Sequence, residues 1–239
     1  MDFEKIYLLG VGLTNLSEKK ILEYIIKNLQ RDGKKYYIVT PNPELLVIAT
    51  KQERYKNVLN GAKIALPDGI GIVLASKLLG KPISARITGV DFMENLCKEV
   101  SKWPITVGFL GGGPNVAEAT ADCLRKKYPG LNVGLVSQEW SEELIFKKID
   151  ILFIAFGSPK QELWIAENLK KLPATVSIGV GGAFDFISGK VSRSPKILRD
   201  LGLEWLFRLI VQPWRIKRQL SIITFVLLVL KEKMSKNKI

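Results

Sequence analysis

The sequence predicts an α/β fold: a mostly parallel, Rossmann-like sheet with helices on both faces, followed by a C-terminal helical appendage. Short apolar segments rich in β-branched residues alternate with amphipathic helical segments along most of the chain, which is the pattern of βαβ units. Beyond about Ser192 the strand signals stop and only helical patterns remain. Hydrophobic residues make up 47% of the 239 residues, which is enough for a large core.

The predicted elements divide the chain into an α/β core of residues 1–192 and a basic amphipathic appendage of residues 193–239. The predicted strands are Ile6–Leu9, Tyr36–Thr40, Ile64–Leu66, Ile105–Leu110, Leu131–Val136, Ile151–Ala155 and Thr175–Ile178. The predicted helices are Ser17–Arg31, Pro43–Leu59, Val90–Lys102, Pro114–Tyr128, Pro159–Lys171, Pro195–Val211 and Pro213–Met234. In such sheets ligands bind at the carboxyl ends of the strands, so the residues that follow each strand are the first candidates for a site.

Positive charge is concentrated in the appendage. The formal net charge is +13, and residues 190–239 hold twelve Lys or Arg against three Asp or Glu, a net of +9. This favours a polyanionic partner. The last predicted helix is apolar with basic ends, which fits either a core-packing helix with a solvated end or an interfacial helix on anionic lipid. No apolar run approaches the roughly 20 residues of a spanning helix, and the acidic N-terminus is unlike a signal peptide, so we expect a peripheral protein at the cytoplasmic face of the cell membrane.

The residue types that are missing restrict the chemistry. The chain has no histidine, and its two cysteines, Cys97 and Cys123, lie in no metal-ligand pattern. The commonest general base and every Ser-His or Cys-His arrangement are therefore excluded. Proton transfer near neutral pH must fall to a carboxylate, tyrosine or lysine. We expect no metal and no cofactor.

Two loops carry polar groups directly after predicted strands. In the first, Thr40 and Asn42 lie in a Thr-Pro-Asn-Pro-Glu segment, where Asn42 is suited to cap the following helix and free N–H groups can meet an anion. In the second, Asp68 lies in Pro-Asp-Gly. That tripeptide is by itself a common turn, but its position between a strand and an apolar helix makes Asp68 a candidate general base.

Three further segments have both a structural and a ligand-binding interpretation. Gly111 and Gly112 belong to a glycine-rich strand-to-helix turn that serves either tight packing or contact with a nucleotide. Gln161 follows Ser158 at the spacing of a capping box, and also lies at the ligand edge of the sheet. Asp185, between two phenylalanines, is a candidate contact for a sugar, ribose or uracil.

Six segments together resemble the WecG/TagA/CpsF glycosyltransferases. They are Thr-Pro-Asn-Pro-Glu, Pro-Asp-Gly-Ile-Gly, Arg-Ile-Thr-Gly-Val-Asp, Gly-Ser-Pro-Lys-Gln-Glu, Gly-Val-Gly-Gly-Ala-Phe-Asp-Phe and Leu-Gly-Leu-Glu-Trp-Leu-Phe-Arg, in this order from about Ile6 to Lys231. Each is weak alone, but six in register are specific.

The resemblance implies an inverting, metal-independent transfer of N-acetylmannosamine from a UDP-sugar donor to polyprenyl-diphosphate-linked N-acetylglucosamine, as in synthesis of a teichoic-acid linkage unit. The uronate of the same sugar stays open as the donor. We expect Asp68 as the base, with Thr40, Asn42, Arg86 and Gln161 in the same cleft. Without a metal, the leaving diphosphate needs arginine, lysine or helix N-termini. Arg208, Arg215 and Arg218 of the appendage are candidates for that contact, the alternative being a basic face on lipid headgroups.

Two other classes of function fit parts of the sequence less well. The +13 charge also fits a basic nucleic-acid-binding α/β protein, but the charge lies in an apolar tail, which suits lipid better, so we expect no nucleic acid. A nicotinamide-dependent oxidoreductase would carry a Gly-x-Gly-x-x-Gly signature after its first strand, and this sequence has none there. We also expect a homo-oligomer and an anionic membrane surface as a partner.

Overall fold

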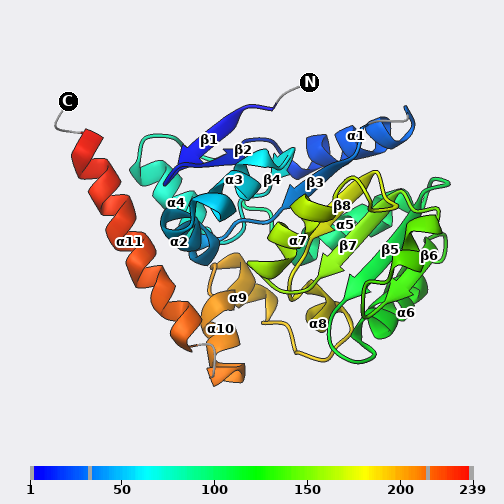
Figure 1. The fold of residues 1–239 in the computed structure, drawn as a ribbon. Coiled ribbons are helices and arrows are strands. Elements are labelled where there is room, and N and C mark those ends of the chain that lie inside the picture. The colour runs from blue at the N-terminus through cyan, green and yellow to red at the C-terminus, as the bar shows by residue number, and fades with distance from the viewer. Residues whose placement is uncertain (1–2, 32–33, 214–215, 237–239) are drawn as a thin grey trace.

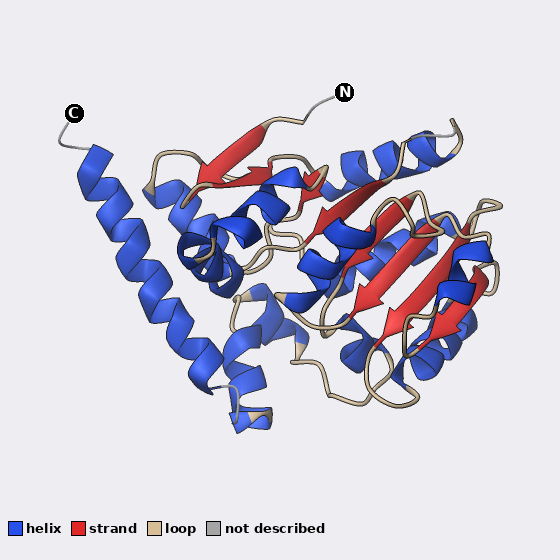
Figure 2. Ribbon diagram, in the orientation of Figure 1, coloured by secondary structure: helices blue, strands red, loops and turns tan. Residues whose placement is uncertain are grey.

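The fold is a parallel sheet between two layers of helices, with one long helix along its side (Figures 1 and 2). The computed structural model describes residues 3–31, 34–213 and 216–236, and for residues 217–219 and 236 the backbone alone. The predicted fold class is confirmed, including the helices that follow the last strand.

Six strands form the main sheet, and all neighbouring strands in it are parallel. Their spatial order is β4-β3-β8-β7-β5-β6. This order brings the carboxyl ends of strands that are far apart in the sequence to one edge. The strands are β3 (Tyr36–Val39), β4 (Ile64–Ala65), β5 (Thr106–Gly111), β6 (Asn132–Ser137), β7 (Ile151–Ala155) and β8 (Val176–Gly179).

Side chains that alternate along the strands supply two cores, one on each face of the sheet. In β7, for example, Phe153 joins the core under α1, α5, α6 and α8, whereas Leu152 and Ile154 join the core under α2, α3, α4, α7 and α11. The helices are α1 (Glu18–Leu29), α2 (Pro43–Lys51), α3 (Glu53–Gly61), α4 (Ile70–Leu78), α5 (Gly89–Val100), α6 (Val116–Lys127), the 3₁₀ helix η1 (Glu142–Phe146), α7 (Lys160–Asn168), α8 (Ala183–Ile187), α9 (Lys196–Asp200), α10 (Glu204–Val211) and α11 (Ile216–Lys236).

The first predicted strand does not join the parallel sheet. It is β1 (Lys5–Leu8), which pairs antiparallel with a strand that the sequence analysis missed, β2 (Val11–Thr14). The glycine-containing segment after β1 is the turn of this hairpin, and both Leu9 and Gly10 have positive φ, at 50° and 79°. Two positive φ values match the right-handed twist of the paired strands, so this segment makes a turn.

Two predicted helices are each divided in the structure. The extended backbone of Gln52 separates α2 from α3 and lets Tyr55 and Leu59 enter the core. Gly202, with a φ of 74°, separates α9 from α10. A Cβ at Gly202 would lie only 2.6 Å from the Cβ of Ile70, so the absence of a side chain lets the α9–α10 turn pack against the start of α4.

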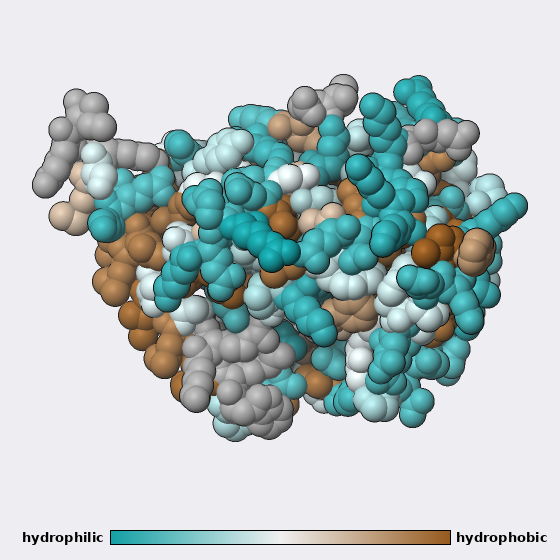
Figure 3. Space-filling view, viewed as in Figure 1, coloured by the Kyte–Doolittle hydropathy of each residue, from teal (hydrophilic) through white to brown (hydrophobic). Residues whose placement is uncertain are grey.

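The last helix, α11, packs along α2 and α4 through Phe225 and Val229, which are buried. A further set of its apolar side chains lies on a different face and stays exposed, and Figure 3 shows apolar side chains gathered along this edge of the molecule. We call this set the outward stripe: Ile216, Leu220, Ile223, Leu227, Leu230 and Met234. In the part of the chain that the structure describes, no helix is both long and apolar enough to cross a bilayer.

Candidate active site

One cleft of about 800 Å³ lies at the carboxyl edge of the sheet. It brings together residues from the loops after β3, β4, β5, β7 and β8 and from the C-terminal helices. This is the edge at which parallel α/β sheets bind ligands. Of the candidates named from the sequence, the cleft is lined by Thr40, Asn42, Asp68, Arg86, Gly112, Gln161, Asp185 and Arg208.

The loop after β3 is held by its own polar groups. Asn42 Oδ1 accepts a hydrogen bond of 3.0 Å from Leu45 N–H, so Asn42 caps α2 as the sequence predicted, with Pro43 at the first helical position. Thr40 Oγ1 donates to the carbonyl of Gly179 at the end of β8, at 3.3 Å. This bond ties together the ends of two neighbouring strands at the floor of the cleft.

Asp68 lies just beyond β4, with its carboxylate on the cleft wall. Its backbone N–H donates to the carbonyl of Pro41, and its Oδ2 accepts a 3.3 Å hydrogen bond from Gly89 N–H. Burial, helped by the nearby negative charges of Glu204 and Asp91, raises the pKa of Asp68 to about 7 against the opposing effects of the Gly89 hydrogen bond and the charge of Arg86. A carboxylate with this pKa exchanges a proton near neutral pH, as a general base must.

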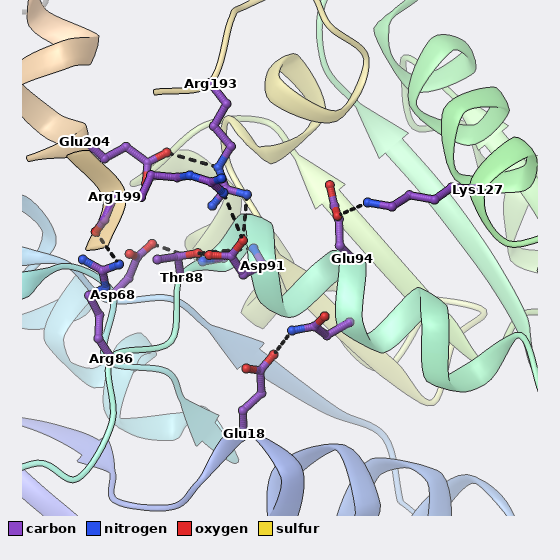
Figure 4. A network of polar contacts seen from close by, with 12 residues as sticks. Glu18, Asp68, Arg86, Thr88, Asp91, Glu94, Lys127, Arg193, Arg199 and Glu204 are labelled. Atoms are coloured by element: carbon purple, nitrogen blue, oxygen red, sulfur yellow. Dashed lines mark hydrogen bonds and ion pairs between the residues drawn. The ribbon is translucent and has the colours of Figure 1, made fainter. Parts of the chain in front are cut away.

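A network of ion pairs connects the region around Asp68 to the C-terminal helices (Figure 4). Arg193 Nη1 donates to Asp91 Oδ1 at 2.7 Å, and Arg193 Nε donates to Glu204 Oε1 at 3.4 Å. Thr88 Oγ1 donates to Asp91 Oδ2 at 2.6 Å. Partial burial alone would raise the pKa of Asp91, but the bonds from Arg193 and Thr88 hold it below its ordinary value. Asp91 is therefore a fixed negative charge that anchors Arg193.

Arg86 extends the same connection. Its Nη2 donates to the carbonyl of Arg199 at the end of α9, at 2.9 Å. Arg86 thus lines the cleft beside Asp68 while it also holds the segment that turns into α10. Side chains of the α/β core therefore hold the C-terminal helices beside the cleft.

Gln161 does not form the predicted capping box. The helix begins at Lys160 without a side-chain cap, because Ser158 Oγ donates to Glu162 Oε1 at 2.7 Å. Gln161 Nε2 donates to Ser158 Oγ and Glu162 Oε1, and Gln161 Oε1 accepts from Gly181 N–H at 3.1 Å. Gln161 and Glu162 are fully buried. Gln161 therefore fixes the loop after β8 that lines the cleft.

The two predicted glycines have different positions. Gly111 does not line the cleft. It ends β5 with a φ of 105°, and a Cβ there would lie 2.9 Å from the backbone of Ala155, so it serves close packing of two strands. Gly112 lines the cleft, with a φ of 84° and its N–H donated to the carbonyl of Ala155. Next to it, the ammonium of Lys190 lies over Gly113.

Of the three candidate arginines of the appendage, Arg208, Arg215 and Arg218, the structure describes the side chain of Arg208 alone. It comes from α10, its guanidinium lies against Gly182 and 4.7 Å from the ring centre of Phe186, and its Nε donates to Gln212 Oε1. Arg208 lines the cleft together with Asp185 and the glycine loop after β8. Arg215 lies outside the described residues, as does the side chain of Arg218.

Comparison with known proteins points to one family. The model of the glycosyl transferase WecG/TagA/CpsF family matches residues 6–239. A Bacillus spizizenii protein named N-acetylglucosaminyldiphosphoundecaprenol N-acetyl-beta-D-mannosaminyltransferase is 36% identical over 209 residues, covering 84% of this chain and 81% of its own. Proteins of the same name from Bacillus subtilis and Staphylococcus aureus are 34% and 32% identical, and cover 99% and 96% of this chain and 94% and 93% of their own.

The chain belongs to the WecG/TagA/CpsF glycosyltransferase family. The family resemblance drawn from the six motifs is thereby confirmed. A glycosyltransferase must hold a donor and an acceptor in one site, with a base where the two meet. In this member of the family, the segments after β5, β7 and β8 supply a mixed wall of glycine backbone, polar side chains such as Gln161 and Asp185, and aromatic rings, whereas α4 and α11 supply a largely apolar wall.

Several residues of this glycosyltransferase's cleft, and of the ion-pair network beside it, were not among the site residues expected from the sequence. Thr88 and Asp91 lie inside the Arg-Ile-Thr-Gly-Val-Asp motif, and Arg193 lies in the glycine- and serine-rich stretch after β8, so motif position alone offered a signal for them. Glu204 and Phe225 lie on the C-terminal helices, where apolar and charged residues are mixed. Their approach to Asp68 depends on how those helices fold back, which the sequence pattern does not express.

Within residues 3–31, 34–213 and 216–236, no three or more cysteine, aspartate or glutamate side chains gather as ligands for a metal ion. Two carboxylates of this region, Asp91 and Glu204, are paired with Arg193 instead. The expectation of a metal-independent reaction stays a prediction.

Proposed function

We propose that this chain transfers N-acetylmannosamine from UDP-N-acetylmannosamine to N-acetylglucosaminyl-diphospho-undecaprenol, with inversion at the anomeric carbon. The acceptor and the sugar follow the names of the relatives that match 84–99% of this chain. The product would be the β-linked disaccharide on the lipid, at the stage of surface-polymer synthesis at which a teichoic-acid linkage unit is made.

The observation that carries this proposal is the position of Asp68. It lies directly before α4, in one cleft with the mixed polar and aromatic wall at the ends of β5, β7 and β8 and the largely apolar wall of α4 and α11. A polar nucleotide-sugar fits the first wall and a lipid-linked sugar fits the second. At the meeting point, a carboxylate with a pKa of about 7 is suited to take a proton from the acceptor hydroxyl.

In the proposed mechanism, one displacement completes the transfer. The Asp68 carboxylate removes the proton of an acceptor hydroxyl, the oxygen attacks the anomeric carbon from the face opposite the diphosphate, and the bond to UDP breaks. The leaving diphosphate gains negative charge as it departs. Arg208 and Arg86, which line the cleft, are positioned to compensate that charge.

Attachment to a membrane is a second part of the proposal. The outward stripe is exposed along α11, and Ile197 and Ile210 are exposed on α9 and α10. Contiguous apolar patches of this kind mark interaction surfaces. With the basic residues of the tail, this surface is suited to a leaflet that contains anionic lipid, where the acceptor resides. The cytoplasmic face and a homo-oligomeric state remain predictions.

Release of UDP from a small panel of UDP-sugars tests the proposed function. The acceptor is N-acetylglucosamine linked through diphosphate to a polyprenyl chain, presented in detergent micelles. We expect turnover with UDP-N-acetylmannosamine and no more than background with its C2 epimer, UDP-N-acetylglucosamine. Turnover only with the N-acetylmannosaminuronate donor would replace the proposed sugar and keep the reaction class. Absence of lipid-dependent turnover with every donor would refute the proposal.

A further inference from the structure

The apolar wall of the cleft is a groove between α4 and α11. On α4 the lining residues include Ile70, Leu74 and Leu78, which are four residues apart and so share one face of the helix. On α11 they include Ile222 and Val226, which are also four apart. Two apolar stripes from helices distant in the sequence therefore face one another across this groove, which we call the α4–α11 groove.

The floor of the groove is closed and its rim is open. Gly71 has no side chain, and a Cβ there would lie 3.8 Å from the ring of Phe225, so α11 packs closely on α4 at this point. Phe225 is 2% exposed. At the rim, Leu74 and Val226 are 57% and 48% exposed. Apolar side chains this exposed on both sides of a groove gain free energy when an apolar ligand covers them.

The groove leads directly to the proposed base. α4 begins two residues after Asp68, so the inner end of the groove is continuous with the part of the cleft that holds its carboxylate. α4 has nine residues, a length of roughly 13 Å. A ligand that fills the groove therefore has an apolar part about this long, with its polar end beside Asp68.

We propose that the α4–α11 groove binds the first isoprene units of the acceptor's polyprenyl chain, next to its diphosphate. The occupant rests on the proposed function, because the acceptor is there a sugar diphosphate on a polyprenol. The groove orients the acceptor with its sugar toward Asp68 and its chain toward the exposed edge of α4 and α11. The remaining isoprene units leave the groove at its far end, beside Leu78, and enter the membrane.

The groove is distinct from the outward stripe of α11. Ile223 and Leu227 follow the groove residues Ile222 and Val226 by one position, which turns them about 100° away around the helix, and both are more than 60% exposed. One face of α11 is thus suited to bilayer contact and the next face to a single lipid chain. The two roles predict different consequences of substitution on the same helix.

Dependence on acceptor chain length tests the proposal. Two acceptors carry the same sugar diphosphate, one on a one-carbon chain too short to enter the groove and one on the full undecaprenyl chain, and both are assayed in detergent micelles. We expect Val226→Asp and Leu74→Asp each to raise KM for the long-chain acceptor by about tenfold or more, from the cost of placing a charge against the chain. The KM for the short-chain acceptor should rise by a smaller factor, so the preference for the long chain shrinks.

Two matched variants control for general effects of a new charge. Leu227→Asp on the outward stripe should weaken binding to vesicles that contain anionic lipid, while the ratio of the two KM values stays that of the unchanged protein. Phe146→Asp introduces the same charge at an exposed aromatic residue of η1, which does not line the cleft, and should leave the ratio unchanged. Equal ratios in all four variants and the unchanged protein would overturn the proposal.

Direct binding separates this inference from the proposed reaction. A photoreactive group on the second isoprene unit of the long-chain acceptor, added with UDP, labels the protein without any turnover. Labels on peptides of α4 and α11, lost with Val226→Asp and kept with Leu227→Asp, would uphold the groove even if the donor sugar proved to be another. Labels confined to the outward stripe would refute the groove even if transfer of N-acetylmannosamine proved correct.

Discussion

Helices α5 and α11 show how differently the two regions of this molecule use apolar residues. In α5, Phe92, Met93 and Leu96 point into the core under the sheet and are fully buried. In α11, Phe225 and Val229 are buried, but the outward stripe along the rest of the helix is exposed. Both helices are apolar at helical spacing, so periodicity alone does not distinguish them.

The difference teaches that an apolar helical face indicates a contact but does not indicate its partner. The faces of α5 are covered because the crossover from β4 to β5 lays the helix on the sheet, whereas α11 follows the last strand and lies at the side of the molecule (Figure 1). Its second apolar face needs a partner outside the chain, which we propose to be lipid. Five predictions test this contrast, from the largest expected effect to the smallest.

Replacing the proposed base in the α/β core should have the largest effect. Asp68→Asn keeps the shape of the side chain and removes its capacity to accept a proton, so turnover should fall by roughly 10²–10⁴-fold with little change in UDP affinity. UDP release and UDP binding by calorimetry measure the two quantities. Asp122→Asn, an exposed residue of α6, is the control and should match the unchanged protein. Near-normal turnover in Asp68→Asn would exclude this residue as the base.

The same substitution should stabilise the folded protein. The pKa of Asp68 is raised on folding, so its contribution to stability is greatest at low pH and is lost as pH rises through about 7. Asn carries no charge to bury, and Asp68→Asn should raise the free energy of unfolding at pH 8 by about 1–3 kcal/mol. The gain should shrink as pH falls toward the unfolded pKa. Urea unfolding at pH 5 and pH 8 measures it.

Truncating one buried residue of α11 tests whether the helix is part of the fold. Phe225→Ala should lower the free energy of unfolding by about 3–4 kcal/mol, because it leaves a cavity against α4. Leu227→Ala, two residues further and 62% exposed, should change it by less than about 0.5 kcal/mol. Urea unfolding without lipid gives both values. Equal small changes would mean that α11 is not packed on the α/β core in solution.

The arginine of α10 tests whether the C-terminal helices take part in catalysis or only in attachment. If Arg208 meets the UDP diphosphate, Arg208→Ala should lower turnover by about 10–10²-fold and weaken UDP binding, with partial rescue in Arg208→Lys. Arg125→Ala, an exposed residue of α6, removes the same charge elsewhere. If both variants lower activity only in proportion to vesicle binding, the C-terminal helices act as an anchor alone.

The smallest effects are opposite shifts in the pH dependence of kcat/KM. Activity should fall as pH drops below about 7, where Asp68 becomes protonated. Arg86→Gln removes a positive charge that lowers the pKa of Asp68, so the acidic limb should move to higher pH. Glu204→Gln removes a negative charge that raises this pKa, so the limb should move to lower pH. Shifts of a few tenths to one pH unit are expected. If both variants moved the acidic limb in the same direction, Asp68 would not be the group whose titration produces it.

Prediction from the sequence was most successful where local chemistry decides the structure. Asn42 was expected to cap α2 and does, because the cap needs only the three residues that follow it. It failed where two local interpretations compete. Ser158 and Gln161 have capping-box spacing, but the neighbouring Glu162 is buried and takes the Ser158 hydroxyl. Gly111 and Gly112 look alike in sequence, and only the approach of β7 shows that the first is a packing position.

The sequence by itself determined the fold class, the family and the absence of a histidine base, since these depend on periodicity, ordered motifs and composition. The tertiary structure decided what surrounds Asp68. Glu204 of α10 and Phe225 of α11 reach its cleft because Gly202 lets the α9–α10 turn pack on Ile70. The pKa of Asp68 depends on burial and on charges that come from residues up to about 136 positions away. Tertiary packing brings these residues close to Asp68 in space, and the pattern of residues along the chain does not contain that information.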